Sequence, residues 1–160
     1  MCYEAQAASE NILRVTPCGV EDLSELKEIL RVSPEAAAWS EETLTGYLRQ
    51  HPGYFFVASL EQHTAGFICG LRAADEGEIL NLAVRPSLRH RGIGKALVGK
   101  LLHIFAQEHV AQVFLEVRES NTRAIAFYEG TGFRQVGRRF GYYQDPAEAA
   151  LVLTFKNKLA

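Results

Sequence analysis

The sequence predicts an α/β fold, with one mixed β-sheet and helices on both of its faces. Segments with apolar residues at helical spacing alternate with shorter segments that are typical of strands. Their order is strand, helix, helix, three strands as a meander, then helix, strand, helix and two closing strands. A chain of 160 residues, 48% of them hydrophobic, can bury its own core. Since no repeat or long linker divides it, we expect one domain over 1–160, with a loose polar leader over 1–11.

Each predicted element has a local signal. Alternation of apolar and polar residues predicts a first strand over 12–16, which Pro17 ends. Apolar residues at helical spacing predict a helix over 20–32, and Ser40 followed by acids predicts the N-cap of a second helix that runs to about residue 50. The other strands are expected at 54–60, 64–71, 78–84, 113–117, 133–143 and 149–155, and the other helices at 96–108 and 121–130.

Composition argues against several classes of function. The net charge of −2 gives no general affinity for nucleic acid or anionic membranes. No apolar run approaches the roughly 18 residues that span a bilayer, and the N-terminal residues lack the pattern of a signal peptide. The three cysteines have no CxxC spacing and are expected to be reduced, which predicts a cytoplasmic protein. The five histidines lack the spacing of metal ligands, so no metal site is predicted.

A basic glycine turn over 89–95 lies between the apolar strand at 78–84 and the helix that follows. Gly92 and Gly94 allow the backbone to approach a ligand closely. A helix N-terminus presents unpaired N–H groups, which favour a phosphate. The turn also carries three basic side chains, Arg89, Arg91 and Lys95. These features predict a site for a cofactor that bears phosphate.

Two common phosphate-binding loops do not fit this turn. A Walker loop would need a glycine in place of Arg89 and a serine or threonine in place of Ala96. A dinucleotide fingerprint would need a glycine or alanine in place of Leu97, and it normally follows the first strand of a domain. Nucleoside triphosphates and dinucleotides are therefore disfavoured as ligands.

Glu116 interrupts an otherwise apolar strand. The period of two places it on the face opposite to Val113, Leu115 and Val117. A carboxylate there is a candidate general base, because an α-amine with a pKa of about 8 is only modestly difficult to deprotonate, directly or through water. Alternatively, Glu116 is a strand-end residue that pairs with Arg118 or Arg123.

Tyr128 and Asn121 share one face of a short predicted helix, about two turns apart. Tyr128 either donates a proton in catalysis or packs with neighbouring phenylalanines, and Asn121 either contacts a cofactor or caps the helix. Trp39, the single tryptophan, either lines an acceptor groove or packs in the core. The residues alone leave these alternatives open.

The pattern Arg-x-x-Gly-x-Gly at 89–94 resembles the acetyl-coenzyme A signature of the GCN5-related N-acetyltransferases (GNAT). The blocks 81–97 and 115–133 are similar to the central half of that family in order and spacing. Within the family, the segments at 39–40, 115–121, 138–139 and 142–143 are most similar to the bacterial group that acts on ribosomal-protein N-terminal alanines. Ala38 departs from the proline usual in that group, and Ala149 and Ala150 make the last hairpin less charged.

The resemblance implies the GNAT fold, a mostly antiparallel sheet of about seven strands, and an acetyl-coenzyme A-dependent N-acetyltransferase. It implies that Glu116 is the general base, that Tyr128 protonates the coenzyme A thiolate, and that an N–H near Val84 stabilises the oxyanion. The implied cofactor contacts are Leu82, Ala83, Val84, Arg89, His90, Arg91, Gly92, Ile93, Gly94, Lys95 and Asn121. The implied acceptor is the N-terminal alanine of a ribosomal protein, with no direct contact to nucleic acid or membrane.

Other functions remain open at this point. The same reaction could serve a small amine, an antibiotic or a lysine side chain, and a chain of this kind could also bind acyl-coenzyme A without catalysing transfer. The basic turn could be a solvated charge cluster. Nucleic-acid binding is disfavoured because the turn has no aromatic stacking platform.

Overall fold

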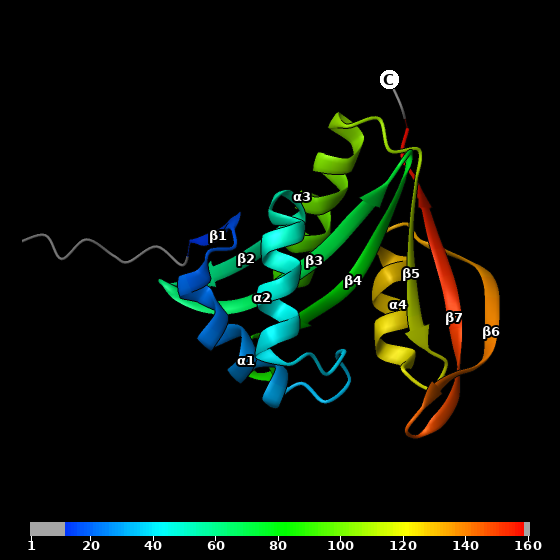
Figure 1. The fold of residues 1–160 in the computed structure, drawn as a ribbon, viewed down its shortest axis with the longest axis horizontal. Helices are drawn as coiled ribbons and strands as arrows, with labels where there is room; N and C mark the ends of the chain where they lie inside the picture. The colour runs from blue at the N-terminus through cyan, green and yellow to red at the C-terminus, as the bar shows by residue number, and fades with distance from the viewer. Residues whose placement is uncertain (1–11, 159–160) are drawn as a thin grey trace, which may run out of the picture.

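The computed structural model describes residues 12–158, and the leader predicted over 1–11 lies outside them. These residues form a seven-stranded sheet in the order β1-β2-β3-β4-β5-β7-β6 (Figure 1). The strands are β1 (Leu13–Pro17), β2 (Phe55–Leu60), β3 (His63–Ala73), β4 (Glu76–Val84), β5 (Gln112–Arg118), β6 (Arg134–Gln144) and β7 (Ala147–Lys156). The α-helices are α1 (Leu23–Arg31), α2 (Glu41–Gln50), α3 (Ile93–Gln107) and α4 (Thr122–Gly130).

The predicted order of elements is confirmed, and the differences lie at their ends. The helix expected from residue 20 begins as a short 3-10 turn, η1 (Val20–Asp22), before α1. Two further 3-10 turns, η2 (Pro52–Tyr54) and η3 (Pro86–Leu88), precede β2 and the glycine turn. Ser40 caps α2 as predicted, because its hydroxyl accepts a hydrogen bond from the N–H of Thr43 at 3.1 Å.

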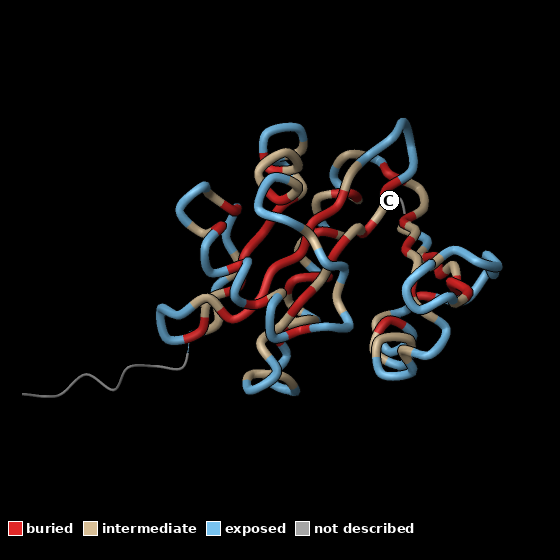
Figure 2. The backbone as a smooth tube through the Cα atoms, turned by 60° about the horizontal axis from the view of Figure 1, so that its bottom comes forward, coloured by how far each residue is buried: buried red, intermediate tan, exposed pale blue. Residues whose placement is uncertain are grey.

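The sheet separates two apolar layers. One layer packs α1 and α2 on the sheet and includes Phe55 and Phe67, which are fully buried. The other packs α3 and α4 on the opposite face and includes Phe105 and Phe133. In Figure 2 the buried residues run along the strands, while the outer turns of the helices are exposed. Helices thus cover both faces, as the sequence predicts.

The single parallel pair among the described strands is also the place where the sheet opens. β4 pairs with β5 only over Glu76 to Glu78, opposite Gln112 to Phe114. β4 continues to pair with β3 as far as Val84, while β5 continues along β7. The two strands therefore diverge beyond Glu78 (Figure 1), and among residues 12–158 no strand pairs with the edge of β4 over 79–84 on its β5 side.

A bulge in β4 changes which side chains face which layer. Cys69 pairs with Asn81 and Gly70 with Ile79, so Leu80 has no partner in β3. Ile79 packs in the layer of α3, whereas Ala83 packs in the layer of α1 and α2. Residues four apart in a regular strand would share a face. The bulge therefore reorients the backbone of β4 along the opening.

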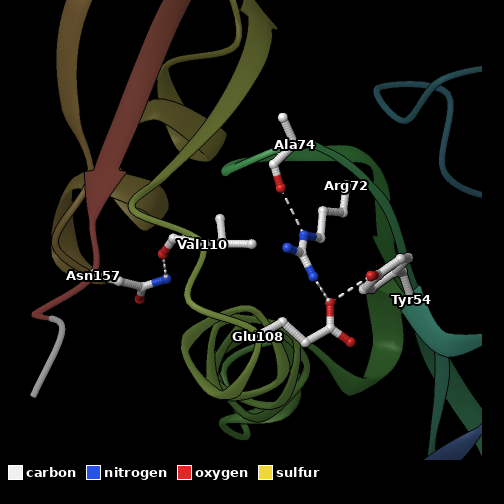
Figure 3. Close-up of polar contacts among 6 residues, drawn as sticks. All are labelled: Tyr54, Arg72, Ala74, Glu108, Val110 and Asn157. Atoms are coloured by element: carbon white, nitrogen blue, oxygen red, sulfur yellow. Dashed lines mark hydrogen bonds and ion pairs between the residues drawn. The ribbon is translucent and has the colours of Figure 1, made fainter.

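Polar contacts hold the closed end of the opening (Figure 3). The Glu108 carboxylate, just after α3, accepts hydrogen bonds from the Tyr54 hydroxyl at 2.5 Å and from Arg72 at 3.2 Å. The Asn157 side chain donates to the carbonyl of Val110 at 2.8 Å. These contacts tie α3 and both halves of the sheet together where β4 and β5 meet, so the opening widens toward the other end.

Candidate functional site

A cavity of about 1280 Å³ occupies the opening between β4 and β5. Its walls come from segments that are distant in sequence. They are the loop between α1 and α2 (34–39), β4 (78–84), the glycine turn and start of α3 (89–95), β5 (115–118), α4 with its N-cap, and the end of β6 (142–145). No helix among residues 12–158 is long and apolar enough to cross a membrane.

The glycine turn forms as predicted at the start of α3. Gly92 is the N-cap and has a φ of 79°, which favours glycine because it lacks a Cβ. His90 also has a positive φ, 62°. A Cβ on Gly94 would stand 3.1 Å from the ring of Phe127, so glycine here allows α4 to pack closely against the first turn of α3. The unpaired N–H groups of that turn lie at the cavity wall.

The basic side chains of the turn separate in space. Arg89 donates from Nε to the carbonyl of Val84 at 3.1 Å, and its guanidinium forms an ion pair with Glu35 in the loop between α1 and α2. Arg91 is exposed and lies outside the cavity lining, whereas Lys95 lines it. The prediction that three positive charges gather at one place is therefore wrong, because Arg91 lies outside the cavity lining and Glu35 neutralises the charge of Arg89.

Glu116 lies on β5 and faces the cavity, with its side chain 15% exposed. One carboxylate oxygen accepts from the Tyr142 hydroxyl at 2.9 Å, and the other lies 3.2 Å from Nε of Arg139. The alternative prediction that Glu116 pairs with Arg118 is wrong, because Arg118 forms its ion pair with Glu148 at 3.2 Å. The sheet explains the difference, because Glu116 of β5 and Gly137 of β6 both pair with Val152 of β7, which brings the following residues of β6 near Glu116 across β7.

Tyr142 holds its proton strongly. Burial, followed by the hydrogen bond to Glu116 and its negative charge, raises the pKa of Tyr142 to about 12. The phenol therefore remains a donor at neutral pH, and together with Arg139 it fixes the orientation of the Glu116 carboxylate.

Tyr128 is a buried aromatic residue that also reaches the cavity. Its ring makes edge-to-face contacts with Phe127 and Phe133, at centroid distances of 5.1 and 5.5 Å. Burial alone raises the pKa of Tyr128 above its ordinary value, so its hydroxyl stays protonated. Asn121 caps α4, since its side-chain oxygen accepts from the N–H of Ala124 at 3.1 Å, and it also lines the cavity. The structure thus confirms the packing of Tyr128 and the helix cap by Asn121, and both residues also line the cavity.

An aromatic pair forms part of the cavity wall. The rings of Trp39 and Tyr47 stack at 4.5 Å, with 11° between their planes, and both line the cavity. The buried Asn81 donates to the carbonyl of Ala37 at 3.0 Å, which ties the loop before Trp39 to β4. Trp39 therefore lines the groove and packs on a neighbour at the same time.

Sequence reasoning overlooked Glu78, which lines the cavity at the point where β4 leaves β5. Burial raises the pKa of Glu78, repulsion by Glu116 raises it further, and Arg139 opposes the shift. The signal that identified Glu116, an acid in an apolar strand, is also present at Glu78.

The cavity brings together the predicted site residues with the exception of Arg91. Those along its lining are Leu82, Ala83, Val84, Arg89, His90, Gly92, Ile93, Gly94, Lys95, Glu116, Asn121 and Tyr128. Over 12–158, no three histidine, cysteine, aspartate or glutamate side chains gather into a group that could hold a metal ion.

Comparisons with known proteins agree on one family. Residues 21–133 match the Acetyltransferase (GNAT) family. The chain is 35% identical over 121 residues to the [Ribosomal protein bS18]-alanine N-acetyltransferase of Escherichia coli (strain K12), covering 74% of this chain and 80% of that protein. The crystal structure of the Escherichia coli ribosomal-protein-S18-alanine N-acetyltransferase superposes with a TM-score of 0.78 at 30% identity, over 93% of this chain and 96% of that one. Ard1 from Thermoplasma volcanium superposes with a TM-score of 0.84 at 26% identity, over 90% and 97% of the two chains.

Proposed function

This chain belongs to the GNAT family of acetyltransferases and is an acetyl-coenzyme A-dependent enzyme, and we propose that its acceptor is the N-terminal alanine of a ribosomal protein. One observation carries the proposal: a single cavity is lined by the glycine turn, Glu116 and Tyr128 together with the aromatic side chains of Trp39 and Tyr142. The Escherichia coli enzyme that is named for the alanine of ribosomal protein S18 resembles the chain over most of its length, both in sequence and in structure, which supports the choice of acceptor. We also propose that the chain is a single domain and that it acts in the cytoplasm.

The residues present fit acetyl-coenzyme A, which supplies an activated acetyl thioester. The left-handed Gly92 and the free N–H groups of α3 suit a pyrophosphate, and Lys95 adds a cation at the same wall. The unpaired edge of β4 suits an extended arm with amide groups, because alternate N–H and C=O groups there have no strand partner. We assign these contacts to Leu82, Ala83, Val84 and to the turn over 89–95, with Asn121 on the opposite wall.

We assign the chemistry to Glu116, Val84 and Tyr128. Glu116 takes a proton from the acceptor ammonium, directly or through water, so that the amine nitrogen can form a bond to the thioester carbon. The N–H near Val84 stabilises the oxyanion that develops on the carbonyl oxygen. As the carbon–sulfur bond breaks, the electron pair goes to sulfur, and the Tyr128 hydroxyl donates its proton toward that thiolate.

The decisive experiment measures coenzyme A release with a peptide that carries the N-terminal residues of a bacterial bS18 protein, beginning with alanine. We expect turnover that depends on the free α-amine and that falls about 10²-fold or more in Glu116→Gln. The same assay with a small amine, an aminoglycoside and a peptide whose only amine is lysine ranks the other acceptors. A higher catalytic efficiency on any of those three would refute the assignment of the acceptor.

A further inference from the structure

The carboxylates that line the cavity differ in whether a basic side chain pairs with them. Of the carboxylates that line the cavity, Glu35 pairs with Arg89 and Glu116 pairs with Arg139, while Asp145 is exposed to solvent. Glu78 differs, because none of the ion pairs or side-chain hydrogen bonds formed within residues 12–158 involves its carboxylate. It is nevertheless half-buried and lines the cavity. A buried carboxylate without a partner is costly unless a cation reaches it.

The geometry of the two strands sets Glu78 beside Glu116. Glu78 pairs in register with Phe114, and Glu116 follows Phe114 by two residues, so all three share one face of the sheet. Gly77, the preceding residue, faces Phe105 of α3, which puts Glu78 on the other face. That is the face covered by α1, α2 and the loop that carries Trp39.

The electrostatics of Glu78 agree with a missing cation. Its carboxylate lies close enough to Glu116 for the two negative charges to repel, and Arg139 offsets this only in part. Arg139 already forms an ion pair with Glu116, and the Arg139 side chain is 60% exposed. A positive group between Glu78 and Glu116 would relieve the repulsion and compensate for the desolvation of both carboxylates.

We propose that Glu78 is a specificity-determining residue that binds the protonated α-amine of the acceptor beside Glu116. This inference rests on the proposed acetyl transfer to a free N-terminus. Glu78 holds the ammonium at the point where β4 and β5 separate, and Glu116 then takes one of its protons. The acetylated product is an uncharged amide, so it loses the attraction of both carboxylates and leaves more readily. Glu78 thus selects a charged amine from β4, the strand that also carries predicted cofactor contacts.

The test compares Glu78→Gln with a matched control, Glu76→Gln. Glu76 lies two residues earlier on the same strand and the same face, but it is exposed. Trp39 is the single tryptophan and lines the cavity, so its fluorescence reports peptide binding. The wild type and both variants are titrated with the alanine-starting peptide and with its N-acetylated form, and their kcat and KM values are measured.

We expect the wild type and Glu76→Gln to bind the free-amine peptide roughly tenfold more tightly than the acetylated one, as a charge-assisted contact predicts. Glu78→Gln should lose most of this preference, with the remainder due to Glu116, and should raise the KM for the peptide severalfold. Its kcat should stay within about threefold, its KM for acetyl-coenzyme A should be unchanged, and its melting temperature should be at least that of the wild type, because the substitution removes the repulsion by Glu116. A variant that keeps the preference overturns the proposal, and so does a variant that loses kcat with an unchanged peptide KM.

Failure of the proposed function gives a different result. If the wild type acetylates a small amine but no peptide, the assigned acceptor is refuted. The role of Glu78 then holds only if Glu78→Gln raises the KM for that amine and Glu76→Gln does not. If the wild type acetylates no amine at all, both proposals are refuted.

Discussion

Replacing Tyr128 with phenylalanine removes a hydroxyl from the cavity wall and leaves the packing of the ring in place. The ring keeps its contacts with Phe127 and Phe133, so the stability of the fold should hardly change. The loss should fall on the departure of coenzyme A, because the proton donor toward the thiolate is gone. We expect kcat to fall while the KM for acetyl-coenzyme A remains close to that of the wild type.

The environment of Tyr128 sets the size of this effect. Ordinary phenols and thiols have pKa values of about 10 and 8.5, so complete proton transfer from tyrosine to a thiolate is uphill by about 2 kcal/mol. Burial raises the pKa of Tyr128 further and widens this gap. In the role proposed for Tyr128, the hydroxyl therefore acts mainly as a hydrogen-bond donor to the developing thiolate, and its removal should cost about 10²-fold in kcat, the low end for general acid catalysis. That factor corresponds to about 2.7 kcal/mol of transition-state stabilisation.

A second tyrosine supplies the control. Tyr54→Phe also removes one hydroxyl, but that group bonds to Glu108 at the closed end of the sheet (Figure 3). Because Glu108 keeps Arg72 and is partly exposed, the loss should be about 1 kcal/mol, or a melting temperature lower by roughly 2–4 °C. Coenzyme A release, followed with a thiol reagent, and thermal unfolding together separate the two variants. If Tyr128→Phe keeps kcat within twofold of the wild type, the assigned role of Tyr128 is refuted.

Three further outcomes follow from packing and charge. In Gly66→Ala the new Cβ would stand 2.6 Å from the carbonyl oxygen of Ala83. This variant should therefore have a lower melting temperature and a higher KM for acetyl-coenzyme A. Unchanged values of both quantities would contradict the geometry. Glu35→Ala should raise the peptide KM about two- to fivefold, because the loop loses its ion pair with Arg89, and a rise confined to the cofactor KM would argue otherwise. Burial raises the pKa of Cys69 to about 12, so its thiol should react with a disulfide reagent only after unfolding in denaturant, and rapid reaction in the native state would show that it is accessible.

Local patterns in the sequence were sufficient for the elements of the fold. The period of two put Glu116 on the face opposite to Val113, Leu115 and Val117, and the structure has the same alternation along β5. Ser40 followed by acids predicted the cap of α2, and the glycines at 92 and 94 predicted the turn before α3. Each of these signals involves residues within a few positions of one another, where backbone geometry alone decides the outcome.

The partners of the charged residues did not follow from local patterns. Tyr142 lies 26 positions from Glu116, and Arg89 lies 54 positions from Glu35, so only the folded sheet brings them into contact. The register of β6 and β7 shifts between Arg139 and Tyr143. No local pattern reports such a shift, because it depends on how two distant strands pair.

The sequence by itself therefore determined the order of helices and strands, the glycine turn before α3 and the face of β5 that carries Glu116. Only the tertiary structure decided where the cavity lies, because it exists where β4 and β5 stop pairing after Glu78. The bulge at Leu80, the ion pair that engages Arg89 and the unbalanced charge of Glu78 also belong to that level. Hydrophobic periodicity is a property of neighbouring residues, whereas strand divergence and charge balance depend on segments that meet only after folding.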